Sequence, residues 1–304
     1  MKKINWKRFM FRLGIVMMVI GAIIMFAKPF ADYLRIETIS KELSDKYGLV
    51  IRFGDPSEFH LPPFTVRTNS EEFNIEKAEK SCVLTALEGV KSALAKYPPA
   101  LVKKYLSAVF VSGEIKSYGV KCGGTYLNSW IYVTTSPAYN RLGSKHYEET
   151  LHHELSSLFL YGPGLKIILH EPNATEFYGS NFPATKWHSA NRPGFRYLER
   201  QIDVIHAAGK FRKPKDAPLW YKDGFVSDYG MTSIENDLNT YAEVAMEHPA
   251  KLKELAEKYP RIAAKTRLFM EFYTSLAPEM ADYFKSVGLD KIQDTGQQIS
   301  ANGL

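Results

Sequence analysis

The amino-acid sequence predicts an α+β fold with a small mixed sheet in its N-terminal part and a mainly helical C-terminal part, preceded by one N-terminal membrane helix. Three observations predict it. A charge-free apolar run follows a basic N-terminus, β-branched and aromatic residues alternate within residues 108–135, and apolar residues recur at helical spacing after residue 144. With 45% hydrophobic and 24% charged residues among 304, the chain can bury a substantial core. We expect three parts: residues 1–31, 32–143 and 144–304.

The N-terminus has the layout of a signal anchor or a signal peptide. Residues 13–27 carry no charge, and they follow a cluster of basic residues, namely Lys2, Lys3, Lys7, Arg8 and Arg12. With its apolar flanks the run approaches the roughly 20 residues that span a bilayer. Small residues are missing where cleavage would need them, so we favour an uncleaved anchor. Positive charge ahead of the span predicts a single-pass protein of the cell membrane whose body is exported, either periplasmic or extracellular.

The charge of the chain is concentrated in that segment. The sequence holds 39 basic and 33 acidic residues, a net charge of +6. Beyond the first twelve residues the chain is nearly neutral and has no basic patch. We therefore expect no nucleic-acid partner.

The two cysteines, Cys82 and Cys122, both lie in the part expected to be exported. An oxidising compartment permits a disulfide between them. It would close a loop of about 40 residues and contribute about 3–4 kcal/mol through loop-closure entropy. Two buried free thiols are the alternative. No CxxC or Cys/His spacing indicates a metal bound by cysteine.

The elements of the first half follow from local patterns. Residues 37–48 have a helical pattern and lead into a short strand, residues 49–54, which a Gly-Asp-Pro turn ends. Apolar residues at helical spacing predict a helix over residues 76–97, stopped by two prolines, and a second over residues 100–106. Glycine breaks divide residues 108–135 into two or three strands.

In the second half the period changes to that of a helix. Residues 144–160 form a predicted helix with a leucine-rich stripe on one face and Glu149, His153 and Ser157 on the other. A long irregular segment with many aromatic residues follows and indicates a functional loop. Residues 224–248 predict a loop and a helix, and the last fifty residues are amphipathic helix.

The candidate chemistry lies in the stretch LHHELSSLF, residues 151–159. His153 and Glu154 open like the zinc signature HExxH, in which two histidines one turn apart hold a metal and the glutamate acts on water. Ser157 stands where the second histidine belongs, and neutral serine is a poor zinc ligand. Neighbouring helical residues point roughly 100° apart, so His152 and His153 do not ordinarily share one ion. His153 is the better candidate because Glu154 follows it.

Other residues could complete a metal site at His153. Glu149, one turn earlier, could substitute geometrically for the missing histidine. Three further histidines are spare candidates, each with a surface or loop position as its alternative: His146, His170 and His188. The same residue pattern is also that of an ordinary solvent-exposed helix face.

Two tracts carry a family resemblance. FVSDYGMTSIENDLNTYAEVAM, residues 225–246, resembles the segment that follows HExxH in gluzincin metallopeptidases of the anthrax lethal factor type and in bacterial zinc-binding metallopeptidases. Many of these proteins carry an HHExS helix ahead of it. WHSANRPGF, residues 187–195, is similar to a tract between the two elements in the bacterial proteins. The likeness covers roughly residues 145–246, and the earlier part is similar more loosely.

The resemblance implies a gluzincin-like metallopeptidase fold with zinc as cofactor. It makes His153 the first metal ligand, Glu154 the general base and Tyr229 the tyrosine that stabilises the developing oxyanion. Two positions depart from the pattern, because Ser157 replaces a histidine and Asn236 stands where the third ligand, a glutamate, belongs. A shift of one residue would supply a carboxylate, and we favour Asp237 as that metal ligand.

These acidic residues have structural alternatives. Thr232 to Glu235 fits a capping box in which Thr232 is the N-cap and Glu235 bonds back to its amide, and we favour this role for Glu235. Asp237 would favour the positive end of the helix. Glu243 falls on the polar face, either solvated or lining a cleft. Tyr229 has a packed loop position as its alternative.

We therefore predict a membrane-anchored, exported, zinc-metallopeptidase-like protein that hydrolyses a peptide or protein substrate with metal-activated water if its site is competent. The competing hypothesis is a pseudoenzyme, a non-catalytic module that keeps the fold and binds a peptide or cell-envelope partner. Substitution of two of three ligands would remove most zinc affinity. An anchored scaffold without a cleft is the third hypothesis.

Overall fold

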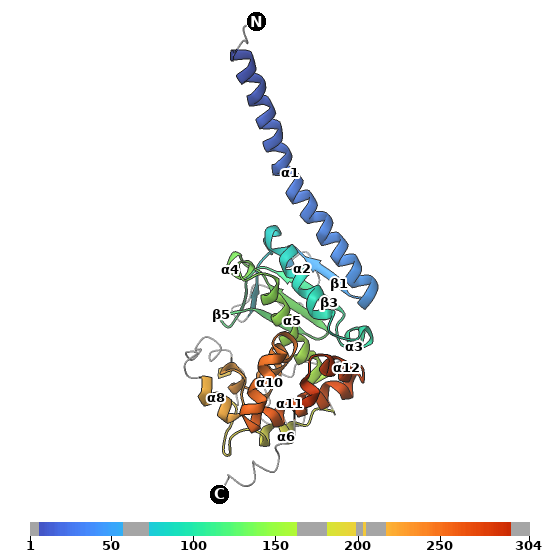
Figure 1. The fold of residues 1–304 in the computed structure, drawn as a ribbon, viewed down its shortest axis with the longest axis vertical. Coiled ribbons are helices and arrows are strands. Elements are labelled where there is room, and N and C mark those ends of the chain that lie inside the picture. The colour runs from blue at the N-terminus through green and yellow to red at the C-terminus, as the bar shows by residue number, and fades with distance from the viewer. Residues whose placement is uncertain (1–5, 57–72, 163–180, 199–202, 205–216, 293–304) are drawn as a thin grey trace.

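The structure is a computed structural model, which describes residues 6–56, 73–162, 181–198, 203–204 and 217–292. Of the first helix it describes the backbone, but not the side chains of residues 6–9, 12, 16 and 19–26. Among these residues the strands lie in the first half of the chain, and the elements of the second half are helices (Figure 1). The predicted α+β class, with a small mixed sheet followed by a mainly helical part, is confirmed. The division into three parts stays a prediction.

Helix α1 (Trp6–Tyr47) is one continuous helix, where the sequence predicted an anchor and a separate helix at residues 37–48. Its N-terminal part projects away from the rest of the molecule (Figure 1). From Ile36 onward α1 joins the core, and Ile39 and Leu43 are buried with it at helical spacing.

Nearer the N-terminus the described apolar side chains of α1 are exposed. Phe11 is 71% exposed and Met18 is 69% exposed. Among the side chains that the structure describes, no helix combines the length and the apolarity that a bilayer crossing needs. Most of the charge-free run at residues 13–27 lies outside those side chains.

The strands form two sheets. The first has the order β1-β3-β7-β6, in which β3 is parallel to β1 and β7, and β6 is antiparallel to β7. The second is antiparallel, with the order β2-β4-β5. The strands are β1 (Val50–Phe53), β2 (Phe73–Ile75), β3 (Ala108–Ser112), β4 (Ile115–Ser117), β5 (Val120–Cys122), β6 (Gly124–Leu127) and β7 (Trp130–Thr134).

Two features of the sheets relate directly to the sequence. Every residue of β3 is buried, which explains its continuous apolar run. Tyr118 and Gly119 both have positive φ, 48° and 79°, as a two-residue hairpin turn between β4 and β5 requires. Strand β2 was not predicted, because three residues are too short to show an alternating pattern.

Helix α5 (Ser144–Tyr161) lies at the centre, between α2 (Lys80–Leu94) and α9 (Ile234–Glu247), with β6 and β7 beside it. Gly89 lets α2 approach, since a Cβ there would lie 2.4 Å from the Ser144 carbonyl oxygen. Other helices of the described residues are α3 (Pro99–Tyr105), α4 (Pro137–Asn140), α6 (Ala184–Ser189), α8 (Ala217–Asp223), η4 (Tyr229–Met231), α10 (Pro249–Lys258), α11 (Pro260–Leu276), α12 (Met280–Ser286) and η5 (Leu289–Lys291).

The two faces of α5 are both covered. The predicted apolar stripe is buried in the main core, as expected: Tyr147, Leu151, Leu155, Leu158 and Phe159. The opposite face packs against α9 and β6. Ser157 is buried, and the side chain of His153 is 14% exposed. The polar face of α5 is therefore not an ordinary solvent-exposed face.

The predicted disulfide is wrong, because Cys82 and Cys122 are both free thiols. Cys82 is buried on α2, whereas the Cys122 thiol points back to its own hairpin, with its Sγ 3.6 Å from the Val120 carbonyl oxygen. The alternative of two free thiols describes the structure.

Candidate functional site

His153 is held between α5 and α9. Its Nδ1 lies 2.5 Å from Oε1 of Glu243, and because a carboxylate only accepts, Nδ1 is the donor. This hydrogen bond leaves Nε2 as the ring atom that can bind another group. The imidazole also stacks on Tyr229, with ring centroids 5.7 Å apart and planes inclined by 17°.

The charges around His153 decide its protonation. Burial alone lowers the pKa of His153, but the hydrogen bond to Glu243 and the charges of Glu243, Glu154 and Glu235 outweigh it and raise the pKa to about 9. Without a metal, His153 is therefore an imidazolium at neutral pH. It balances part of the charge of three nearby carboxylates.

Glu154 lies on the side of α5 that faces β6. It is 7% exposed, and a Cβ added at Gly124 would come 3.1 Å from its Oε1, so the glycine allows the strand to approach. Burial raises the pKa of Glu154 to about 7; His153 opposes the shift, while Glu235 and Glu243 add to it. A carboxyl with a pKa near 7 has the proton affinity that a general base needs at neutral pH.

Ser157 takes part in a hydrogen-bonded cluster at the position of the missing histidine. Its Oγ donates to Oε1 of Glu235 at 2.7 Å and accepts from Nδ2 of Asn239 at 2.8 Å. Tyr161 donates to the other oxygen of Glu235 at 2.9 Å, and Tyr126 hydrogen-bonds the same carboxylate. Glu235 therefore belongs to this site.

The predicted capping box is wrong by one residue. The N-cap of α9 is Ser233, whose Oγ accepts from the Asn236 amide at 3.0 Å. Thr232 donates instead to the Tyr229 carbonyl at 2.7 Å and accepts from the Asn236 side chain at 2.8 Å. Because the helix begins one residue later than predicted, the side chain of Glu235 points across to α5 and not back to the cap.

Asp237, the predicted second metal ligand, is not brought together with His153. It is fully buried, and its Oδ2 accepts from Trp187 Nε1 at 2.8 Å, from the Tyr197 hydroxyl at 2.6 Å and from the ammonium of Lys265. Lys265 is itself fully buried, 4.0 Å from the centroid of the Phe225 ring. Asp237 is thus the counter-ion of a buried lysine.

Tyr229 opens the 3-10 turn η4, next to His153. Burial raises its pKa, and the charges of Glu154 and Glu235 raise it further. The phenol therefore stays protonated at neutral pH and can donate a hydrogen bond. Its part in stabilising an oxyanion stays a prediction.

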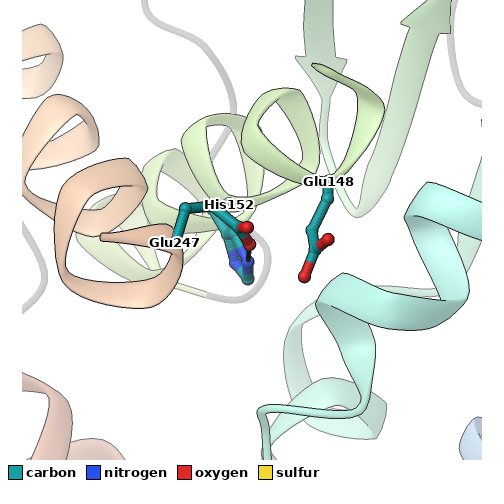
Figure 2. A group of neighbouring side chains, drawn as sticks. All are labelled: Glu148, His152 and Glu247. Carbon is teal, nitrogen blue, oxygen red and sulfur yellow. Dashed lines mark hydrogen bonds and ion pairs between the residues drawn. The ribbon is translucent and has the colours of Figure 1, made fainter. Parts of the chain in front are cut away.

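The other histidine of the pair, His152, lies in a second cluster. His152 and Glu148 come from α5 and Glu247 comes from α9 (Figure 2), and each offers a ligand atom within 4.8 Å of the others. Imidazole and carboxylate are donors that zinc takes. The zinc predicted from the sequence thus has a possible Glu/His/Glu donor set in the structure, which includes His152, and the metal role of His153 stays a prediction. Within the described part of the chain no other group of three meets this criterion.

Every donor and acceptor of the second cluster is engaged. Nε2 of His152 donates to Oε1 of Glu247 at 2.9 Å, and Nδ1 accepts from the Tyr97 hydroxyl at 2.7 Å. Burial lowers the pKa of His152, so its ring is neutral at pH 7. The carboxylates are paired with two lysines, Lys96 and Lys145.

The spare candidates have other contacts, namely Glu149 with His248, His146 with Tyr139, and His188 with Tyr197. His170 lies outside the described residues.

Sequence reasoning missed the roles of Glu235 and Glu243, although a signal was present. Glu235, Asn239 and Glu243 recur every four residues on α9, as His153, Ser157 and Tyr161 do on α5. The contacts run in reverse order, His153 to Glu243, Ser157 to Asn239 and Tyr161 to Glu235, as two antiparallel helices require.

Comparisons with known proteins give one structural likeness. No family model and no curated protein matches the chain. A solved structure described as "a putative zinc-binding metallo-peptidase" from Bacteroides caccae is similar over 87% of this chain and 97% of that one, with 14% sequence identity and a TM-score of 0.46. At this TM-score the two backbones differ too much for residues to be matched between them.

Proposed function

We propose that this protein is a gluzincin-type, metallopeptidase-like hydrolase with a divalent metal, zinc first among candidates, at His153. The observation that carries the proposal is the Glu243 carboxylate on Nδ1 of His153. Metal-binding histidines characteristically donate their second ring nitrogen to a carboxylate, which fixes the ring and leaves the other nitrogen for the ion.

The residues that would hold a divalent ion are His153, through Nε2, and Glu235, through its carboxylate, with the Ser157 hydroxyl as a weak third ligand. His153 and Glu235 are near enough for the glutamate to raise the pKa of the imidazole. A metal bound there would supply Lewis-acid activation of water.

The surrounding residues supply the remaining chemistry. Glu154 accepts a proton from the attacking water, which its pKa of about 7 suits. The Tyr229 phenol, which stays protonated, donates a hydrogen bond to the developing oxyanion of a peptide carbonyl. Glu243 holds the His153 ring in place. Peptides and proteins are the proposed substrates.

A non-catalytic, peptide-binding pseudoenzyme is the second candidate. This candidate is favoured by the hydrogen bonds of Ser157, which stands where HExxH has its second histidine. The Ser157 hydroxyl donates to Glu235 and accepts from Asn239, so its hydrogen bonds are complete without an ion. In that case Glu235 is a structural acceptor, and His153 remains an imidazolium paired with Glu243.

The metal content of the full-length chain, purified without chelator, separates the two candidates. We expect near-stoichiometric metal in the parent, none in His153→Ala, and about 10–100-fold weaker binding in Glu243→Gln. His248→Ala is the matched control, because His248 also joins the two helices, through Glu149, but outside the site. A folded parent that stays empty with excess zinc would favour the pseudoenzyme, and metal lost only in His152→Ala would place the ion in the second cluster.

Membrane anchoring is a separate proposal. It is supported by the basic residues ahead of the apolar run and by exposed apolar side chains such as Phe11 and Met18 on the projecting part of α1. We expect the full-length chain to remain in the membrane fraction after carbonate washing, and a chain that begins at Asp32 to be released. Release of the full-length chain by carbonate would contradict anchoring.

A further inference from the structure

The ammonium of Lys96 occupies a cage of three oxygens. Its Nζ lies 2.8 Å from Oε1 of Glu148, 2.5 Å from Oε1 of Glu247 and 2.7 Å from the carbonyl oxygen of Met246. An ammonium has three protons to donate, so this cage satisfies it completely. The same two carboxylates and His152 form the cluster of possible metal ligands in Figure 2.

The charges of this group balance without a metal. Glu148 and Glu247 carry two negative charges, Lys96 and Lys145 carry two positive ones, and His152 is neutral. Burial opposes ionisation of Glu247, but hydrogen bonds from His152, Lys145 and Lys96 lower its pKa below the usual range. A divalent ion added to the intact group would leave an uncompensated charge in a largely buried place, so an ammonium must leave before an ion can enter.

The two lysines do not contribute equally. The side chain of Lys145 is 69% exposed, whereas that of Lys96 is 22% exposed. Solvent weakens the ion pairs of the former much more. Lys96 also lies beside Tyr97, whose hydroxyl donates to His152, so two consecutive residues after α2 bind the same group.

We infer that Lys96 is a built-in cation which takes the place of a metal ion among Glu148, His152 and Glu247 and fastens the end of α2 to α5 and α9. Loss of the ammonium therefore uncovers a latent divalent-metal site. The ligand atoms already lie within 4.8 Å of one another, and zinc bonds of about 2 Å require only a small approach.

Metal titration of full-length variants tests this inference. Lys96→Ala is expected to melt at a lower temperature than the parent in chelator and to recover on addition of zinc, with cobalt giving the absorption bands of a bound ion. Lys96→Met, which keeps the aliphatic stem, is expected to behave alike, whereas Lys96→Arg keeps the charge and gains no metal response. Lys91→Ala is the matched control, since Lys91 is a half-exposed lysine in the last turn of α2, shortly before Lys96, and is paired with Glu42.

Two further variants show at which site Lys96→Ala binds zinc. Repeating the titration in a His153→Ala background excludes the site of the proposed function, on which this inference does not depend. Adding His152→Ala to Lys96→Ala should abolish the gain, with zinc binding at least about tenfold weaker. The inference is overturned if neither neutral variant gains zinc-dependent stability over the parent, if both fail to fold even with zinc, or if the parent already binds zinc through His152.

Discussion

Glu154→Gln should abolish peptide hydrolysis while making the metal-free protein more stable. Loss of a general base reduces turnover by about 10²–10⁴-fold. Glutamine has the shape of glutamate but no charge, and Glu154 is buried beside Glu235 and Glu243. Cleavage of labelled casein and of a peptide mixture by the zinc-loaded protein measures the first effect, and urea unfolding measures the second.

The gain in stability of Glu154→Gln over the parent should increase as the pH rises. The pKa of Glu154 is about 7 in the folded protein, above its usual value of 4.5, so the folded state binds its proton more tightly than the unfolded state. Below about pH 4.5 Glu154 is protonated in both states and does not lower the free energy of unfolding. As the pH rises, ionisation of Glu154 lowers the free energy of unfolding, by at most about 3 kcal/mol at about pH 7. Glu154→Gln should match the parent at low pH and exceed it above pH 7.

Glu257→Gln is the control, because Glu257 is exposed and lies 3.9 Å from Lys253. It should change the free energy of unfolding by less than about 0.5 kcal/mol. Full activity in Glu154→Gln would exclude Glu154 as the base. An inactive, metal-free parent would exclude hydrolysis altogether and leave the pseudoenzyme.

Lys265→Met should destabilise the fold by about 3–5 kcal/mol. Lys265 and Asp237 are both fully buried, and removal of the lysine leaves a carboxylate whose charge only the Trp187 and Tyr197 hydrogen bonds offset. Burial lowers the pKa of Lys265 to about 8, but Asp237 opposes the shift, so the ammonium persists at neutral pH. The free energy of unfolding in urea at pH 7 measures the loss.

Lys253→Met, at an exposed lysine, is the matched control and should have little effect. Asp237→Asn in the Lys265→Met background should recover part of the loss, because it removes the unpaired charge. A loss below about 1 kcal/mol in Lys265→Met would show that the buried pair is not maintained in solution. Asp237→Asn should also retain metal at the parent level, which tests directly the metal role that the sequence suggested for Asp237.

The sequence predicted elements well where a single helix or strand carries its own pattern. The helix expected at residues 144–160 is α5 (Ser144–Tyr161), and its leucine stripe is buried. The apolar pattern was less informative about the residue at which a helix begins. Residues 76–97 were expected to be helical, but α2 begins at Lys80, and the α9 cap lies one residue further on than predicted.

The candidate site was harder to predict than the helices, because it depends on contacts between two helices. Glu235 and Asp237 lie two positions apart, which turns a helical side chain by about 200°, so Glu235 faces Ser157 on α5 whereas Asp237 faces the buried Lys265. His153, Glu154 and Tyr229 do lie in one neighbourhood, since the motif fixes the first two and the turn fixes the third. The role of Glu243 was not predicted, because its partner lies on another helix. The periodicity of one helix does not reveal which other helix a given face contacts.

The continuity of α1 has a mechanical consequence. From Trp6 to Ile36, where burial begins, the helix extends about 45 Å without a loop. A flexible tether would let the body swivel, whereas a continuous helix transmits tension from its far end to the contact of Ile36, Ile39 and Leu43 with the core, and bends most readily at Pro29, which lacks a backbone N–H to donate. Whatever holds the N-terminus therefore also aims the body, and proteolysis between Lys28 and Arg35 would free it to rotate while leaving those three core residues in place.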